Sequence, residues 1–138
     1  MSPRLFLLAG EPSGDRLGAA LIAGLRELAP GVEVAGIGGP EMAEQGLESL
    51  FPMSDLSVMG LAEVLPRYPA LRRRLHQAAA AVAAMRPDAL LTIDSPDFSL
   101  RLAALARRAR PELWTIHYVA PSVWAWRPGR ARAMSRYI

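Results

Sequence analysis

Four short apolar runs, separated by longer amphipathic segments, divide the chain. They predict buried β-strands, because each is short, mainly apolar and bounded by turn-forming or charged residues. The predicted strands are Arg4–Leu8, Val32–Ile37, Asp88–Ile93 and Leu113–Val119.

The segments between these runs carry apolar residues at helical spacing. Ser13 is the expected N-cap of the first helix, and Pro30-Gly31 is its stop signal. The alternation of strands and helices predicts one α/β domain, a doubly wound, Rossmann-like parallel sheet with helices on both faces. The predicted helices are Asp15–Leu28, a short helix from Pro40 to Gly46, a helical region at about 60–85 interrupted at Pro66 and Pro69, a helix that ends near Arg110, and a last helix cut off at Ile138.

Three loops follow predicted strands and are expected to meet at one edge of the sheet. They are Gly10–Gly14, Asp94–Asp97 and Ala120–Arg127. In open parallel sheets, ligands bind at the carboxyl ends of the strands. This edge is therefore the predicted functional site.

The residue composition restricts the chemistry available there. The chain of 138 residues has no Cys and only two His, so disulfides, thiolate zinc sites, a cysteine nucleophile and a His-based metal cluster are excluded. Proton transfer therefore falls mainly to carboxylates. No apolar stretch approaches the length of a membrane span or a signal-peptide core, so a cytoplasmic location is expected.

Charge is distributed unevenly along the chain. Residues 1–66 hold three Arg and nine acidic residues, a net charge of −6, whereas residues 67–138 hold 13 Arg and four acidic residues, a net charge of +9. The basic half suggests an anionic partner such as phosphate or anionic lipid. The alternative is that these Arg coat solvent-facing helices. Nucleic acid is not an expected partner, since no recognisable binding module accompanies the Arg.

The loop after the third strand carries two aspartates. A carboxylate at a strand's carboxyl end can act as a general base toward an attacking hydroxyl. Asp97 is better explained as the cap of the next helix. Asp94 leaves the strand directly, so it is the stronger catalytic candidate, although a hydrogen bond within its own loop is the alternative.

The other candidate segments each have two interpretations. The first loop opens a helix whose free N–H groups suit phosphate, but it lacks the GxGxxG spacing and the P-loop lysine, which favours an ordinary turn. The aromatic fourth loop combines Trp124 and Trp126 with Arg127, either as a sugar-stacking site or as a lid over the core. The amphipathic stretch Met59–Leu75 suits either an interfacial membrane helix or core packing.

Taken together, five motifs resemble the lipid-A-disaccharide synthase family, in order along essentially the whole chain. They are Ala9–Asp15, Gly38–Pro40, Ser57–Gly60, Ile93–Phe98 and His117–Arg127. Pro12 and Ser95 depart from common family residues without touching the proposed chemistry. The resemblance implies a GT-B glycosyltransferase in which residues 1–138 form the amino-terminal, acceptor-side domain, and the carboxy-terminal nucleotide-sugar domain is absent from this chain.

The resemblance also implies a reaction and its participants. Family members join UDP-2,3-diacylglucosamine to 2,3-diacylglucosamine 1-phosphate (lipid X) with inversion, releasing UDP, and no metal or cofactor is expected. The enzyme is expected to associate peripherally with the cytoplasmic face of the inner membrane, and the chain alone is expected to be inactive. Alternatives are an acyl-sugar or membrane-binding module without turnover, or another GT-B nucleotide-sugar enzyme.

Site residues are carried over by motif. Asp94 matches the proposed catalytic carboxylate. The expected substrate-binding residues are Glu11, Ser13, Gly14 and Asp15 in the first loop and Ser122, Trp126 and Arg127 in the fourth. The expected membrane or acyl-chain contacts are Leu61, Val64, Leu65, Tyr68 and Leu71.

Overall fold

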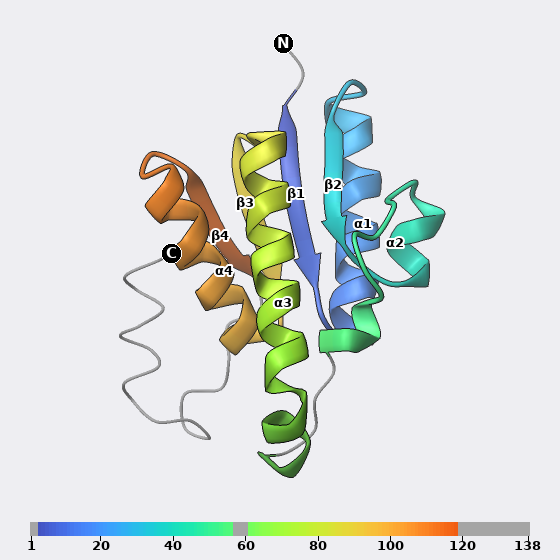
Figure 1. Ribbon diagram of the computed structural model, residues 1–138. Helices are drawn as coiled ribbons and strands as arrows, with labels where there is room; N and C mark the ends of the chain where they lie inside the picture. The colour runs from blue at the N-terminus through green and yellow to red at the C-terminus, as the bar shows by residue number, and fades with distance from the viewer. Residues whose placement is uncertain (1–2, 57–60, 119–138) are drawn as a thin grey trace.

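The computed structural model describes residues 3–56 and 61–118, with the backbone alone at 61–68 and at Pro96. Its centre is a four-stranded sheet in the order β2-β1-β3-β4, with every neighbouring pair parallel (Figure 1). The strands are β1 (Arg4–Ala9), β2 (Glu33–Ile37), β3 (Ala89–Ile93) and β4 (Trp114–Tyr118). All four agree with the predicted strands to within about two residues.

Helices cover both faces of this sheet, as the alternating pattern predicts. In Figure 1, α3 and α4 lie in front of the sheet and α1 lies behind it, beside α2. The helices are α1 (Pro12–Leu28), α2 (Pro40–Glu44), the 3₁₀ helix η1 (Met53–Leu56), α3 (Leu61–Met85) and α4 (Pro96–Ala109). The predicted interruption at Pro66 and Pro69 is wrong, because α3 runs through both prolines as one helix.

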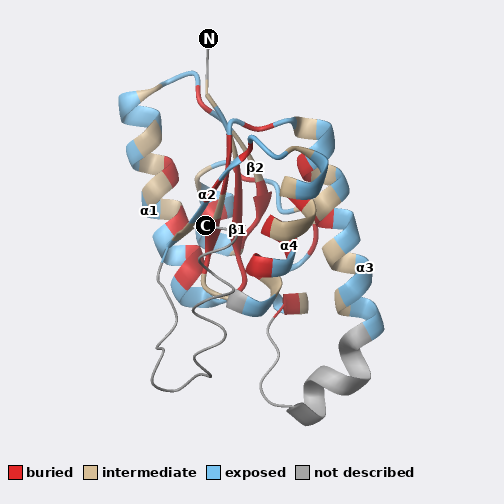
Figure 2. Ribbon diagram, turned by 90° about the vertical axis from the view of Figure 1, so that its left-hand side faces the viewer, coloured by how far each residue is buried: buried red, intermediate tan, exposed pale blue. Residues whose placement is uncertain are grey.

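Alternation along β1 divides the core into two layers. Phe6 and Leu8 point to the α3 and α4 side, whereas Leu7 and Ala9 point to the α1 and α2 side. All four side chains are buried, and Figure 2 shows the buried positions concentrated on the strands and on the inner helix faces. A strand that is buried on both faces must be apolar throughout, which explains the uninterrupted run in the sequence.

The strand order creates a switch point between β1 and β3. From β1 the chain moves through α1 outward to β2, and then crosses back through α3 to β3, on the opposite side of β1. Right-handed crossovers in opposite directions put α1 and α4 on opposite faces, so the loops after β1 and β3 diverge from one point. Ligand sites of doubly wound sheets lie at this kind of point. The predicted loop Ala120–Arg127 and the predicted last helix lie outside the described residues.

Candidate functional site

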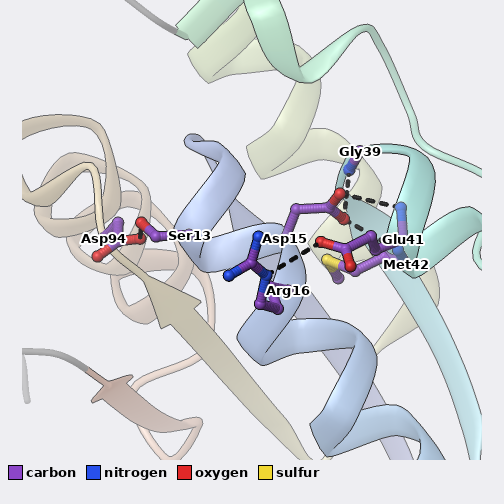
Figure 3. A network of polar contacts seen from close by, with 7 residues as sticks. All are labelled: Ser13, Asp15, Arg16, Gly39, Glu41, Met42 and Asp94. Atoms are coloured by element: carbon purple, nitrogen blue, oxygen red, sulfur yellow. Dashed lines mark hydrogen bonds and ion pairs between the residues drawn. The ribbon is translucent and has the colours of Figure 1, made fainter.

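A serine and an aspartate from two loops meet at the switch point. β1 leads through Gly10 and Glu11 into α1, and β3 leads directly into Asp94. The Ser13 hydroxyl donates a hydrogen bond to Asp94 Oδ2 over 3.0 Å (Figure 3). The sequence prediction that the Gly10–Gly14 and Asp94–Asp97 loops converge is therefore confirmed.

The backbone after β3 takes an uncommon conformation at two successive residues. Asp94 has φ 57° and Ser95 has φ 42°, both in the left-handed region that non-glycine residues rarely adopt. The Ser99 hydroxyl, which is buried, donates to the Asp94 carbonyl oxygen over 2.9 Å and so holds this turn. Left-handed residues of this kind cluster at functional sites.

Two glycines allow the loops to come this close. A Cβ at Gly14 would lie 2.7 Å from Asp94 Oδ2, and a Cβ at Gly10 would lie 1.9 Å from Ser95 Oγ. Any larger side chain at either position would push the second loop away from the first. Gly10 and Gly14 therefore form part of the geometry of the site.

The electrostatic setting of Asp94 suits a negative charge. Its half-buried carboxylate lies against the first turn of α1, where backbone N–H groups lack partners within the helix. The cap residue Glu11 makes no side-chain hydrogen bond to them. The positive end of the helix dipole therefore faces the place where Asp94 and any anionic ligand would lie.

Asp15 has a different environment, which Figure 3 shows on the far side of α1 from Asp94. Its side chain is buried, and its Oδ1 accepts hydrogen bonds from the backbone N–H groups of Gly39 and Met42, both over 2.9 Å. Its Oδ2 accepts a third, from Glu41, over 3.0 Å. A Cβ at Gly39 would lie 2.6 Å from Oδ2, so this residue must be glycine. Asp15 therefore satisfies the free backbone N–H groups at the start of α2, and these contacts account for its position without a bound ligand.

Two predicted helix caps are wrong. The helix α1 begins at Pro12 with Glu11 as its cap residue, so Ser13 lies inside the first turn and its hydroxyl is directed to Asp94. The cap residue of α4 is Ser95, and Asp97 lies in the first turn instead. In both cases a proline at the start of the helix sets its beginning earlier than the serine or aspartate pattern indicates.

The other predicted site residues divide into described and undescribed ones. Glu11 is exposed at the start of α1, two residues before Ser13. Leu71 is partly buried and packs against the core on the α3 and α4 side of the sheet. Outside the described residues lie Ser122, Trp126 and Arg127, and also the side chains of Leu61, Val64, Leu65 and Tyr68.

Sequence reasoning placed Gly10 and Ser95 in loops of the predicted site without giving either a role, and it did not identify Ser99. Gly10 and Ser95 lie within two of the family motifs, and Ser99 directly follows one of them. Only the register between β1 and β3 shows which of these residues approach one another. Among the side chains that the structure describes, no three carboxylate or imidazole groups are gathered as metal ligands would be. Within residues 3–56 and 61–118, no helix is long and apolar enough to cross a membrane.

Arg74, in the basic half of the chain, has structural partners. Arg74 pairs with Asp55 of η1 through two nitrogens, at 2.9 Å and 2.7 Å, and its guanidinium lies 4.9 Å from the centre of the Phe51 ring. Together these contacts attach α3 to the segment that follows β2. For Arg74, local packing therefore explains the charge.

The sequence of this chain matches one family of known proteins. A family model described as lipid-A-disaccharide synthetase matches residues 5–138. The lipid-A-disaccharide synthase of Ruegeria pomeroyi is 63% identical over 135 residues, which are 98% of this chain and 33% of that protein. The synthase of Rhodospirillum centenum is 59% identical over 140 residues, which are 100% of this chain and 35% of that protein.

The chain thus spans about a third of the length of these relatives, at their amino-terminal end. The family model covers nearly all of it, and the site at the switch point lies within the matched region. The chain belongs to the lipid-A-disaccharide synthase family.

Proposed function

We propose that this chain forms the acceptor-side domain of an inverting glycosyltransferase that makes the lipid A disaccharide. The reaction joins UDP-2,3-diacylglucosamine to 2,3-diacylglucosamine 1-phosphate and releases UDP. Family membership supports the class of reaction. The observation that carries the assignment to residues is the Asp94 carboxylate at the switch point, held by Ser13.

Asp94 is the proposed general base. In this step, one carboxylate oxygen of Asp94 takes the proton of the acceptor's 6-hydroxyl, while the hydroxyl oxygen of the acceptor bonds to the anomeric carbon of the donor sugar. The bond from that carbon to the UDP oxygen breaks on the opposite face, which inverts the configuration. Asp94 is half-buried, so an acceptor hydroxyl can reach its carboxylate.

The amino-terminal end of α1 is the proposed anchor for the acceptor's polar groups. Glu11 is exposed there, and the free N–H groups of the first turn suit sugar hydroxyls or a phosphate. Ser122, Trp126 and Arg127 are proposed to complete the site from the fourth loop, on the basis of the family motif. Most of the nucleotide sugar is proposed to bind to a second domain.

The first test of this proposal uses a chimera of the relatives' length. This chain replaces the matched region of the Ruegeria pomeroyi synthase, and UDP release is measured with both acylated substrates. Asp94→Asn should lower kcat by about 10²-fold or more, because the base is lost while the shape is kept. Asp97→Asn is the matched control, since it removes an exposed carboxylate from the same end of α4 and should change kcat by less than about 3-fold.

A chimera that binds acceptor but releases no UDP would support a binding module instead of a transferase. Release of UDP from unacylated UDP-sugars alone would indicate another GT-B enzyme. If Asp94→Asn turned over at the wild-type rate with an unchanged fold, Asp94 would have no part in the reaction.

We also propose that the amino-terminal part of α3 contacts the cytoplasmic face of the inner membrane. The support is the apolar sequence of Leu61, Val64, Leu65 and Tyr68 beside Arg67, Arg72 and Arg73. The chain should sediment with vesicles that contain phosphatidylglycerol, and Val64→Ser with Leu65→Ser should abolish this. Ala80→Ser, on an exposed position of the same helix, is the control. Equal sedimentation of all variants would contradict the proposal.

A further inference from the structure

We propose that Ser13 is a positioning residue for Asp94, an inference that rests on the proposed function of Asp94 as the base. Its hydroxyl fixes one carboxylate oxygen and thereby aims the other at the acceptor. This differs from the substrate-binding role that the family motif implies for Ser13.

The first argument is the direction of the hydroxyl. Ser13 lies in the first turn of α1, a position from which a hydroxyl can bond to nearby backbone of its own helix. Instead it bonds to a side chain 81 residues away, at 3.0 Å. Because the cap residue of α1 is Glu11, the Ser13 hydroxyl is not needed to begin the helix.

The second argument is the freedom that Asp94 would otherwise have. Its backbone is held by Ser99 through the Asp94 carbonyl oxygen, at 2.9 Å. The carboxylate itself is only half-buried and can rotate toward water. The Ser13 bond to Oδ2 restricts this rotation, because a hydrogen bond to an ionised oxygen is stronger than one between neutral groups. Oδ1 is then the oxygen that takes the acceptor's proton.

The third argument is the space between the two residues. Gly14 follows Ser13, and a Cβ there would already lie 2.7 Å from Oδ2. The carboxylate therefore packs directly on the first turn of α1. This contact leaves Asp94 few orientations that keep the Ser13 bond, so the bond selects one of them.

Ser13→Ala in the chimera should lower kcat about 10-fold to 30-fold, while KM for the acceptor changes less than about 3-fold, because a misdirected base slows proton transfer and leaves binding intact. Ser13→Thr keeps the hydroxyl and should recover most of the rate. Ser54→Ala, an exposed serine of η1 at the same end of the sheet, is the matched control and should match the wild type. In an Asp94→Asn background, Ser13→Ala should lower kcat by less than about 2-fold, since its effect passes through Asp94.

A second measurement uses this chain alone and does not depend on turnover. With the aspartate carboxyl groups ¹³C-labelled, Ser13→Ala should move the NMR signal of Asp94, and Ser13→Thr and Ser54→Ala should leave it near the wild-type position.

The outcomes separate the two proposals. An inactive wild-type chimera would count against the proposed function, and the Asp94 signal would still decide the role of Ser13. A raised acceptor KM with unchanged kcat would overturn positioning in favour of substrate binding. Equal losses from Ser13→Ala with and without Asp94, or an unmoved Asp94 signal, would also overturn it.

Discussion

Gly14 is the residue of α1 on which the Asp94 carboxylate packs. A Cβ there would meet Asp94 Oδ2 at 2.7 Å and Ile93 Cγ2 at 3.3 Å. Gly14→Ala should therefore displace the carboxylate and lower kcat about 10-fold or more in the chimera, while the helix itself loses nothing from alanine.

Gly24 on the same helix provides the matched control. Nothing lies within 4 Å of a Cβ built there, so Gly24→Ala should raise the free energy of unfolding by about 0.5–1 kcal/mol with unchanged kcat. Urea unfolding and UDP release measure the two effects. An active Gly14→Ala variant would show that Asp94 need not lie against α1.

At the scale of elements, Asp15 attaches α2 to α1. Asp15→Ala should lower the free energy of unfolding by about 2–4 kcal/mol, because three backbone N–H groups of Gly39, Glu41 and Met42 lose their acceptor in a largely buried place. The measurement is urea unfolding followed by circular dichroism.

Arg16→Ala is the comparison for this prediction. Arg16 reaches Glu41 over 3.7 Å, and its side chain is 82% exposed, so its removal should change the free energy of unfolding by less than about 0.5 kcal/mol. If Asp15→Ala and Arg16→Ala lowered the free energy of unfolding equally, the hydrogen bonds from Asp15 to the start of α2 would not account for its contribution to stability.

Elements were the most predictable level of this structure, and contacts between them the least. The apolar run before Gly10 and the one before Asp94 predict their strands, because burial on both faces demands apolar residues. Asp94 could be chosen from its place after a strand. The roles of Ser13 and Asp15 could not, since their partners lie 81 and 24–27 residues away and depend on register and helix packing. Local capping preference, which favoured Ser13 and Asp97 as caps, was overridden by Pro12 and Pro96.

At the scale of the whole molecule, the site depends on the central strands. β1 and β3 pair along five residues, from Leu5 with Ala89 to Ala9 with Ile93, and the segments that follow them carry Ser13 and Asp94. Leu90, fully buried in β3, supports this pairing from the α3 and α4 side. The two polar residues can meet only when the centre of the sheet has formed.

Consequently, a ligand that contacts the segments after both β1 and β3 should stabilise the folded domain. The proposed acceptor sugar phosphate, at 100 times its Kd, should raise the free energy of unfolding by about 2.7 kcal/mol, because it binds the folded state and not the unfolded state. Thermal unfolding with and without acceptor measures this, and the rise should persist in Leu90→Ala, whose own cavity costs about 2–5 kcal/mol. If the unfolding temperature were the same with and without acceptor, the acceptor would not bind at the ends of these strands. With the proposed acceptor as its ligand, such a domain would be most stable at high ligand concentration, and its resistance to proteolysis would rise and fall with that concentration.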